Sequence, residues 1–510
     1  MELIQCWAGY KHRFVRIFSS IPHQCGITNK DDRKHLIPEM NSSLLRHLPA
    51  IDEILLQDRI ADALVSVPRE QVVQWAREEV DLLRQRVLVG EELQVEGLMS
   101  LVVEQVIGRL SQDYSARMQT VLNATGILLH TNLGRAPLAE AAVAHVQAAA
   151  GCTNLEMDLG SGKRSIRGAR VRELLAKLTG AEDAIIVNNC AAATILTLQA
   201  IAAGREVIVS RGQLVEIGGG FRLPEVFESA GVRLREVGTT NRTYLRDYEN
   251  AVDEETGAII RVHRSNFQQS GFVTEPAIDE MVLAQRPKDI PVIDDLGSGH
   301  VVDLSERELP EIIRNEPRVQ QSVSAGADLC LFSGDKLFGG PQCGVIVGKK
   351  KWVSKLAQHP MMRALRADKL ILAAMEATTE IHLAGKSAEQ VPFFQMLLQP
   401  VEAIRNRCEQ VLESLRSNLS SDIRLSIESC YSQVGGGSMP GAEIPSFALS
   451  VRSESSNYSV ETMASRLRAG TPAVHARISE DSMLLDLRTI QPRQTAALLE
   501  ALAKWGEEMP

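Results

Sequence analysis

The sequence predicts an α/β protein built on a mainly parallel sheet with helices on both faces. Short apolar runs alternate with helical stretches at intervals of about 20–35 residues, which is typical of βα units. The runs occupy residues 184–188, 206–210, 232–237, 257–262, 291–295 and 328–333. A helical pattern precedes this region and a mixed helix and strand pattern follows it, which predicts a smaller domain on each side.

Length and composition indicate an ordinary globular protein of two or three domains. The chain has 510 residues, of which 44% are hydrophobic and 23% charged. A net charge of -9 and an aromatic content of 4% argue against a dedicated nucleic-acid-binding protein. The eight cysteines show no spacing suited to zinc, so we expect a cytoplasmic protein without a metal site. No apolar stretch reaches the length of a membrane helix.

The pattern along the chain predicts four segments. Residues 1–39 mix basic and apolar residues without a period, so either translation starts at Met40 or this arm is disordered. Residues 40–118 repeat leucine and valine three and four positions apart, which predicts a small helical domain. Residues 119–385 contain the alternating runs, and residues 386–510 form a smaller C-terminal α+β domain.

Ligands of parallel sheets bind at the carboxyl ends of the strands, so the residues that follow each run are candidate site residues. After the first run, Asn188 or Asn189 can cap a helix whose first turn is small, with Cys190, Ala191 and Ala192. Small side chains leave the free N–H groups of a helix start open to a phosphate. The alternative is an alanine-rich helix that only packs on the sheet.

Acidic, hydroxyl and amine groups follow other runs. Only one of Asp294 and Asp295 faces the cleft, because side chains alternate along a strand. After the last run, Ser333 can donate to a phosphate and Lys336 can act as an amine nucleophile. Taken singly, the acid and the lysine have a plain explanation as solvated surface groups. Run 257–262 is followed by polar residues common in turns, His263, Ser265 and Asn266.

Taken together, these groups match the needs of pyridoxal 5'-phosphate. The lysine forms a Schiff base with the cofactor, and an aspartate keeps its pyridine nitrogen protonated so that the ring accepts electrons. The helix start and Ser333 are suited to the phosphate. A nicotinamide cofactor is disfavoured, since no G-x-G-x-x-G joins a first strand to a helix.

Four longer motifs carry a family resemblance over the chain from about Met40 to the C-terminus. They are "NATGILLHTNLGRAPL" (123–138), "VGTTNRTYLRDYENAV" (237–252), "DDLGSGHVVDLS" (294–305) and "FSGDKLFGGPQCGVIVGKK" (332–350). In this order they closely resemble the bacterial L-seryl-tRNA(Sec) selenium transferases, also called selenocysteine synthases.

The resemblance implies a fold-type I pyridoxal phosphate enzyme. Members convert L-seryl-tRNA(Sec) to L-selenocysteinyl-tRNA(Sec) with selenophosphate, by β-elimination to a dehydroalanyl intermediate and addition of selenium. They are homodecamers built from dimers, with sites at the dimer interface. The resemblance therefore implies that residues 119–385 are the catalytic domain and that residues 40–118 recognise the tRNA.

The resemblance also implies roles for single residues. Lys336 resembles the Schiff-base lysine and Asp295 the partner of the pyridine nitrogen, with Asp294 as the alternative. Residues 190–192 resemble the phosphate cup, and Asn266 the group near the ring hydroxyl. The site for the anionic selenium donor is expected to use three arginines, Arg135, Arg363 and Arg366. A fixed fork of donors suits such an anion.

Several alternatives stay open at this point. The glycine pair Gly339 and Gly340 can bring its backbone close to a phosphate, including that of a neighbouring subunit. The basic segment 161–173 contacts cofactor or tRNA phosphates, or it is a solvated face. The rival functions are a related pyridoxal phosphate lyase for a small amino acid or sugar acid, and an RNA-binding protein that has lost catalysis.

Overall fold

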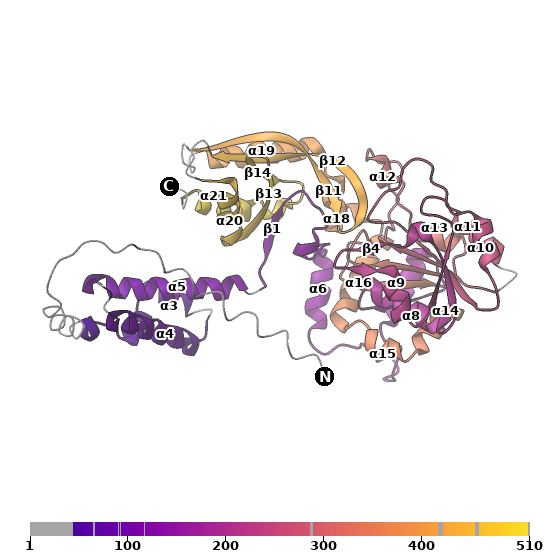
Figure 1. The fold of residues 1–510 in the computed structure, drawn as a ribbon, viewed down its shortest axis with the longest axis horizontal. Coiled ribbons are helices and arrows are strands. Elements are labelled where there is room, and N and C mark those ends of the chain that lie inside the picture. The colour runs from indigo at the N-terminus through magenta and orange to yellow at the C-terminus, as the bar shows by residue number, and fades with distance from the viewer. Residues whose placement is uncertain are drawn as a thin grey trace, which may run out of the picture. The chain divides into compact units, whose positions relative to one another are not determined.

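The fold divides into two compact units, Met1–Gln119 and Thr120–Pro510. The computed structural model describes residues 44–64, 67–89, 91, 93–116, 118–285, 289–416, 422–453 and 458–507 (Figure 1). The predicted extension 1–39 lies outside the described residues. Among the described residues, no helix is both long and apolar enough to cross a membrane.

The described part of the first unit is helical. Its elements are α2 (Ile51–Leu55), α3 (Asp58–Ala63), α4 (Arg69–Leu88), a short 3-10 helix (Val95–Gly97) and α5 (Leu98–Ala116). Helix α4 buries one stripe of side chains spaced three and four apart, Val72, Ala76, Val80, Leu83 and Val87. These side chains share a core with residues of α2, α3 and α5. The predicted helical pattern is therefore present in this unit.

The second unit contains a seven-stranded sheet with strand order β2-β10-β9-β8-β7-β3-β6. Its strands are β2 (Asp183–Val187), β3 (Glu206–Ser210), β6 (Arg233–Val237), β7 (Thr256–Val262), β8 (Val292–Gly297), β9 (Leu329–Ser333) and β10 (Gly344–Gly348). Each of the six predicted runs forms a strand. Strand β10 runs antiparallel to both of its neighbours, β2 and β9, whereas the pairs from β9 to β6 are parallel. The sheet is mainly parallel, as predicted.

Helices cover both faces of this sheet (Figure 1). The helices of this region are α6 (Glu140–Ala149), α7 (Ala169–Thr179), α8 (Cys190–Ala202), α9 (Leu223–Ser229), α10 (Leu245–Ala251), α11 (Ile278–Gln285), α12 (Glu311–Arg314), α13 (Val319–Ser324), α14 (Lys350–Gln358), α15 (Met361–Leu365), α16 (Lys369–Leu383), α17 (Ser387–Gln390) and α18 (Pro392–Leu398). Two short strands, β4 (Glu216–Ile217) and β5 (Phe221–Arg222), form a separate hairpin.

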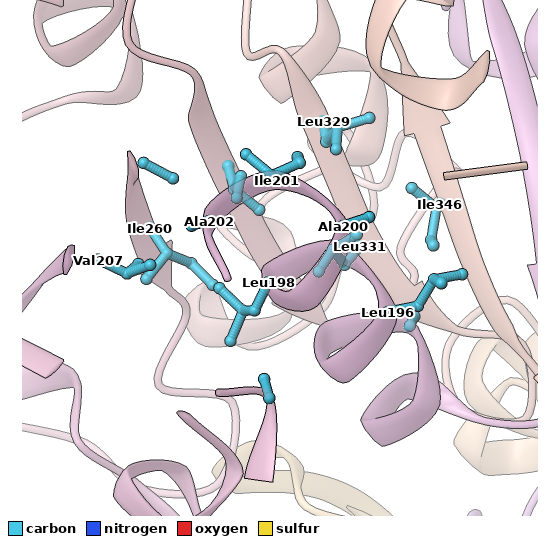
Figure 2. Close-up of a cluster of buried hydrophobic side chains, with 14 of the residues drawn as sticks. Leu196, Leu198, Ala200, Ile201, Ala202, Val207, Ile260, Leu329, Leu331 and Ile346 are labelled. Atoms are coloured by element: carbon cyan, nitrogen blue, oxygen red, sulfur yellow. The ribbon is translucent and has the colours of Figure 1, made fainter. Parts of the chain in front are cut away.

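Alternate side chains of the central strands pack into the cores on opposite faces of the sheet. The predicted runs of these strands are therefore apolar at successive positions and not only at every second one. In β3, Val207 and Val209 join the core beneath α8, α9 and α14, whereas Ile208 joins the core beneath α10 and α11. Figure 2 shows part of the first core, with Leu196 of α8 and Leu331 of β9 among the buried side chains. The central strands are therefore held from both sides, and their carboxyl ends are fixed in position.

The C-terminal strands form a second sheet, of order β1-β13-β14-β12-β11. Its elements are β1 (Val121–Ala124), β11 (Ile423–Gly435), β12 (Ser438–Ser453), β13 (Ala473–Ser479) and β14 (Ser482–Asp486), with α19 (Val401–Leu415), α20 (Val460–Ala469) and α21 (Thr495–Glu507). Strand β1 pairs in parallel with β13. The start of the predicted segment 119–385 therefore belongs to the sheet of the C-terminal segment, a pairing that local sequence does not reveal.

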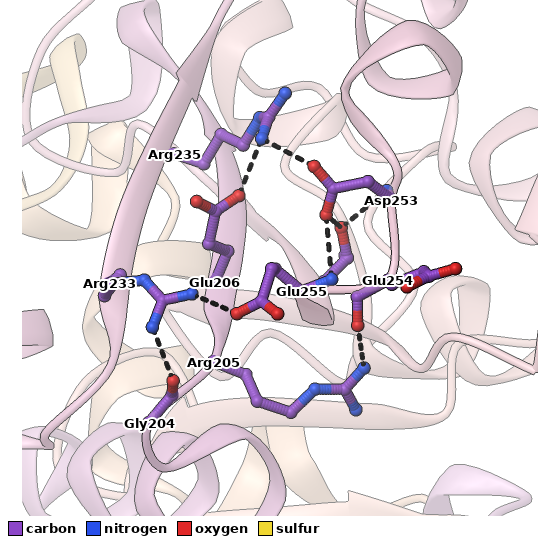
Figure 3. A network of polar contacts seen from close by, with 9 residues as sticks. Gly204, Arg205, Glu206, Arg233, Arg235, Asp253, Glu254 and Glu255 are labelled. Atoms are coloured by element: carbon purple, nitrogen blue, oxygen red, sulfur yellow. Dashed lines mark hydrogen bonds and ion pairs between the residues drawn. The ribbon is translucent and has the colours of Figure 1, made fainter.

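The amino ends of β3, β6 and β7 carry charge pairs. Arg235 Nη1 lies 2.8 Å from Glu206 Oε2, and Arg233 Nη2 lies 2.6 Å from Glu255 Oε2 (Figure 3). These side chains are partly exposed, so each pair contributes little to stability, about 0–1 kcal/mol. They neutralise this edge of the sheet, while the polar groups predicted to bind a ligand lie at the opposite edge.

We expect Leu329→Ala to lower the free energy of unfolding by about 2–5 kcal/mol, because a fully buried leucine would leave a cavity in the centre of the sheet. The measurement is the midpoint of urea unfolding. Leu283→Ala is the matched control, since this side chain is 60% exposed and its loss should change stability by less than about 0.5 kcal/mol. Equal effects of the two changes would contradict this account of the core.

Candidate active site

A cavity of about 210 Å³ lies at the carboxyl edge of the seven-stranded sheet. The ends of β7, β8 and β9 and the start of α8 contribute its walls. Its charged lining residues are Arg135, Asp295, Asp335 and Lys336, with His263 beside them. The parallel strands deliver these groups to one edge because their carboxyl ends coincide there.

Lys336 follows β9 and is only 4% exposed. Burial lowers the pKa of its amine, since the charged form loses its hydration, and the positive charge of Arg135 acts in the same direction. A lowered pKa increases the share of neutral amine, which is the nucleophilic form. The lysine is therefore a buried group suited to covalent chemistry and not a solvated surface residue.

The two acids of β8 face opposite ways. Asp295 lines the cavity, and Thr194 Oγ1 donates to its Oδ2 at 3.0 Å. Burial raises the pKa of Asp295 to about 6, although the Thr194 hydrogen bond opposes the change. Asp294 is fully buried on the other side and pairs with Arg261, with nitrogen–oxygen distances of 2.8 and 2.7 Å. The structure thus places Asp295, and not Asp294, in the cavity.

The start of α8 supplies backbone donors. The Asn189 side chain accepts from Ala192 N at 2.8 Å, and the Asn189 carbonyl accepts from Ala193 N at 3.1 Å. The preceding N–H groups, those of Cys190 and Ala191, are the ones that a helix start leaves without a helical acceptor. Asn189, Cys190 and Ala191 line the cavity together with Ser333 across it. This is the arrangement that an anionic ligand group requires.

Arg135 also reaches the cavity. Its Nη1 lies 2.8 Å from Asp335 Oδ2, which belongs to the residue next to Lys336. Arg135 has a φ of 62°, in the left-handed region that non-glycine residues rarely occupy. The loop that follows β1 therefore holds this arginine against the segment that carries the lysine.

The other predicted arginines do not line this cavity within one chain. Arg363 is exposed on α15, and Arg366 follows that helix with Nη1 3.9 Å from Glu156 Oε1. Glu156 also pairs with Arg164 and Arg167 of the basic segment 161–173. Much of that segment's charge is therefore balanced by acids of the same chain.

Asn266 and the glycine pair also lie outside the cavity lining. Asn266 Nδ2 donates to the carbonyl oxygen of Glu216 at 2.7 Å. Gly339 and Gly340 are buried, and a Cβ on Gly339 would lie 2.3 Å from Val391 Cγ1. Close packing within the chain accounts for glycine at position 339, where φ is 72°.

Sequence reasoning assigned no role to several polar lining residues, among them His263, Ser265, Thr194 and Asp335. His263 and Ser265 follow the run 257–262, so their position was the available signal, but turn residues of this kind are common. Thr194 lies one helical turn beyond Cys190, and a helix start was expected to contribute only its first residues. Asp335 is adjacent to Lys336, but no feature of the sequence indicated that its side chain lines the cavity.

Comparison with known proteins identifies the family. The profile of L-seryl-tRNA selenium transferase matches residues 121–491, and that of the selenocysteine synthase N-terminal region matches residues 45–84. The chain belongs to the L-seryl-tRNA(Sec) selenium transferase family.

Two curated relatives carry the name L-seryl-tRNA(Sec) selenium transferase. The relative from Geobacter sulfurreducens is 44% identical over 463 residues, which cover 90% of this chain and 99% of the relative. The relative from Carboxydothermus hydrogenoformans is 43% identical over 88% of this chain and 94% of its own. A solved structure of D-glucosaminate-6-phosphate ammonia-lyase superposes with a TM-score of 0.53 and 22% identity, over 78% of this chain and 98% of its own. It is similar in fold.

Family membership makes the chain a pyridoxal phosphate-dependent enzyme, and its fold is that of fold-type I. The cavity fits this cofactor. It offers a buried amine at Lys336, a buried carboxyl at Asp295 and the open N–H groups of the α8 start. These three groups match an aldehyde, a basic ring nitrogen and a phosphate.

We expect Lys336→Ala to abolish the visible absorption of the protein with bound cofactor, because no amine would remain in the cavity to bond to the aldehyde. The measurement is an absorption spectrum after cofactor addition and gel filtration. Lys386→Ala is the control, since Lys386 is an exposed lysine outside the cavity. A wild-type protein that stayed colourless would refute the assignment of the cofactor.

Asp295→Asn should stabilise the cofactor-free protein, and more so at pH 8 than at pH 5. The pKa of Asp295 is raised from 3.8 to about 6, so its contribution to stability is present below pH 3.8 and is lost as the pH rises through 6. The gain should grow by on the order of 1 kcal/mol between pH 5 and pH 8. Urea unfolding at both pH values measures it.

Asp294→Asn is the matched control and should have the opposite sign. It removes the carboxylate that pairs with Arg261, which should cost about 3–5 kcal/mol of stability. If the two substitutions changed stability in the same direction, the assignment of different roles to these neighbouring acids would be wrong.

Proposed function

We propose that the chain converts L-seryl-tRNA(Sec) to L-selenocysteinyl-tRNA(Sec) at the cavity that contains Lys336. The observation that carries this proposal is the pairing of a buried amine and a buried carboxyl at one sheet edge, in a chain of this family. Loss of the seryl β-hydroxyl and addition of selenium at the same carbon are the expected steps.

Different cavity residues would have different roles in the first steps of the reaction. When bound, pyridoxal phosphate supplies an electron sink for the bond to the seryl α-hydrogen. Asp295 would hold the protonated ring nitrogen, and Ser333 with the α8 start would hold the phosphate. Lys336, once free of the cofactor, would take the α-proton on Nζ and later return it to the product.

The selenium donor is proposed to be selenophosphate, bound as an anion by arginines. Arg135 lies in the cavity, and its guanidinium already pairs with a carboxylate, Asp335, which an incoming anion would displace. Arg363 and Arg366 lie outside the cavity lining of one chain. Their proposed role therefore requires an assembly in which α15 approaches a site, as in a homodecamer built from dimers.

The helical unit is proposed to bind the tRNA. The profile of the selenocysteine synthase N-terminal region matches residues 45–84, which include α2, α3 and most of α4. We place the reaction in the cytoplasm, where aminoacyl-tRNA is used.

The test is incubation of the protein with seryl-tRNA(Sec) and selenophosphate, followed by analysis of the amino acid released from the tRNA. Selenocysteine is expected with the wild type and with Lys386→Ala, and none with Lys336→Ala, because only the last lacks the cavity amine. Free serine serves as the competing substrate. Turnover of free serine but not of seryl-tRNA(Sec) would replace this proposal with a lyase acting on a small amino acid.

A further inference from the structure

His263 stands at the edge of the cavity without a role in the steps above. It directly follows β7, and its backbone N–H donates to the Asp295 carbonyl oxygen at 2.8 Å. Its side chain is 26% exposed and lines the cavity with Lys336. Among the described residues of the lining, it is the only histidine.

A buried carboxylate lies behind this imidazole. Glu316 follows α12, and its Oε1 lies 3.3 Å from His263 Nε2, with the glutamate side chain only 5% exposed. Burial alone would raise the pKa of Glu316, but His263, Ser298 and His300 together outweigh it and hold the pKa below its usual value. The glutamate is therefore an anion that favours a positive charge on His263.

No other neighbour supplies that charge directly. Ser298 and His300, from the loop after β8, also face Glu316, and burial lowers the pKa of His300 to about 4. His300 is therefore neutral at pH 7. Arg318, two residues further on, has Nη1 2.9 Å from Asp303 Oδ2. Among the described residues, His263 is the basic side chain that lies within ion-pair distance of Glu316.

The proposed reaction contains a step that needs an acid. The seryl β-hydroxyl is a poor leaving group unless its oxygen is protonated as the carbon–oxygen bond breaks. Lys336 accepts the α-proton in the same elimination. Nε2 lies 3.3 Å from Glu316 Oε1, and the other ring nitrogen, Nδ1, makes no hydrogen bond within the described part of the chain.

We propose that His263 is the general acid that protonates the departing β-hydroxyl, and that Glu316 is the positioning residue that stabilises its imidazolium. This inference rests on the proposed function. The α-hydrogen leaves as a proton to Lys336, and its bonding electrons form the double bond between the α- and β-carbons. The carbon–oxygen bond breaks with its electrons on oxygen, which takes the Nδ1 proton and leaves as water. His263 remains neutral, with its remaining proton on Nε2, the nitrogen that lies 3.3 Å from Glu316 Oε1.

The test compares two leaving groups in the full-length protein with bound cofactor. We expect His263→Gln to slow single-turnover loss of the seryl group from seryl-tRNA(Sec) by about 100-fold or more, the usual effect of losing a general acid. With tRNA(Sec) carrying β-chloroalanine, the same variant should stay within about 3-fold of the wild type, since chloride leaves without a proton. His145→Gln, an exposed histidine of α6, is the matched control.

Glu316 is tested by the pH dependence of the same rate. Glu316→Gln should move the alkaline limb of the profile to lower pH, because a carboxylate no longer stabilises the imidazolium, and Glu316→Asp should restore part of the shift. Glu311→Gln, an exposed acid of α12, should leave the profile unchanged. Cofactor affinity, measured from visible absorption, should stay within about 3-fold of the wild type in every variant.

The outcomes separate this inference from the proposed function. A wild type that leaves seryl-tRNA(Sec) unchanged overturns both. His263 is not the acid if the wild type reacts and His263→Gln slows the reaction of both substrates equally. The same conclusion follows if the main effect of His263→Gln is a lower affinity for the cofactor. An unchanged profile in Glu316→Gln overturns the role of the glutamate.

Discussion

The Lys336 amine and the Asp295 carboxyl are buried in one cavity at the carboxyl edge of the sheet, and their burial determines the chemistry available there. Water does not stabilise the charged forms there, so the pKa of the amine falls and that of the acid rises. Both groups then gain from a ligand that offers the amine an aldehyde and the acid a positive charge. Pyridoxal phosphate offers both, so its binding would stabilise the two buried groups.

Asp294, the acid next to Asp295, is also buried but has a positively charged partner. Asp294 is buried even more deeply than Asp295, but the alternation of β8 turns it to the opposite face. There, Arg261 of β7 binds it through two hydrogen bonds, and Ser322 of α13 donates to it as well. Strand β8 thus carries one carboxylate that pairs with an arginine, Asp294, and one that has hydroxyl and thiol partners only, Asp295. Only Asp295 lines the cavity.

Much of this site could be predicted because strand ends and backbone alternation are local properties. The six apolar runs located six of the seven strands of the central sheet, all but β10, and the residues that follow the runs located Lys336, Asp295 and the start of α8. The path of the chain beyond a strand end depends on tertiary contacts instead. Those contacts bring His263 to the cavity and direct Asn266 to Glu216.

Distant pairings were also beyond local reasoning. Nothing in residues 121–124 distinguishes a strand of the C-terminal sheet from one of the central sheet, because the pairing partner, β13, lies some 350 residues later. The same holds for Glu316, which reaches His263 across 53 positions of sequence. The predicted site for the selenium donor included Arg363 and Arg366, but the structure places both outside the cavity lining of one chain.

A cysteine, Cys190, lines the cavity, and its environment keeps the thiol protonated. Cys190 Sγ lies 3.8 Å from Asp295 Oδ1, and burial together with this acid raises the pKa of the thiol well above its usual value. The thiol is not a nucleophile in its protonated form. An elimination that creates a double bond in this cavity exposes an electrophilic β-carbon, and a thiolate at position 190 would compete with selenium for it. In the proposed reaction, a protonated sulfur would leave the β-carbon to the selenium nucleophile.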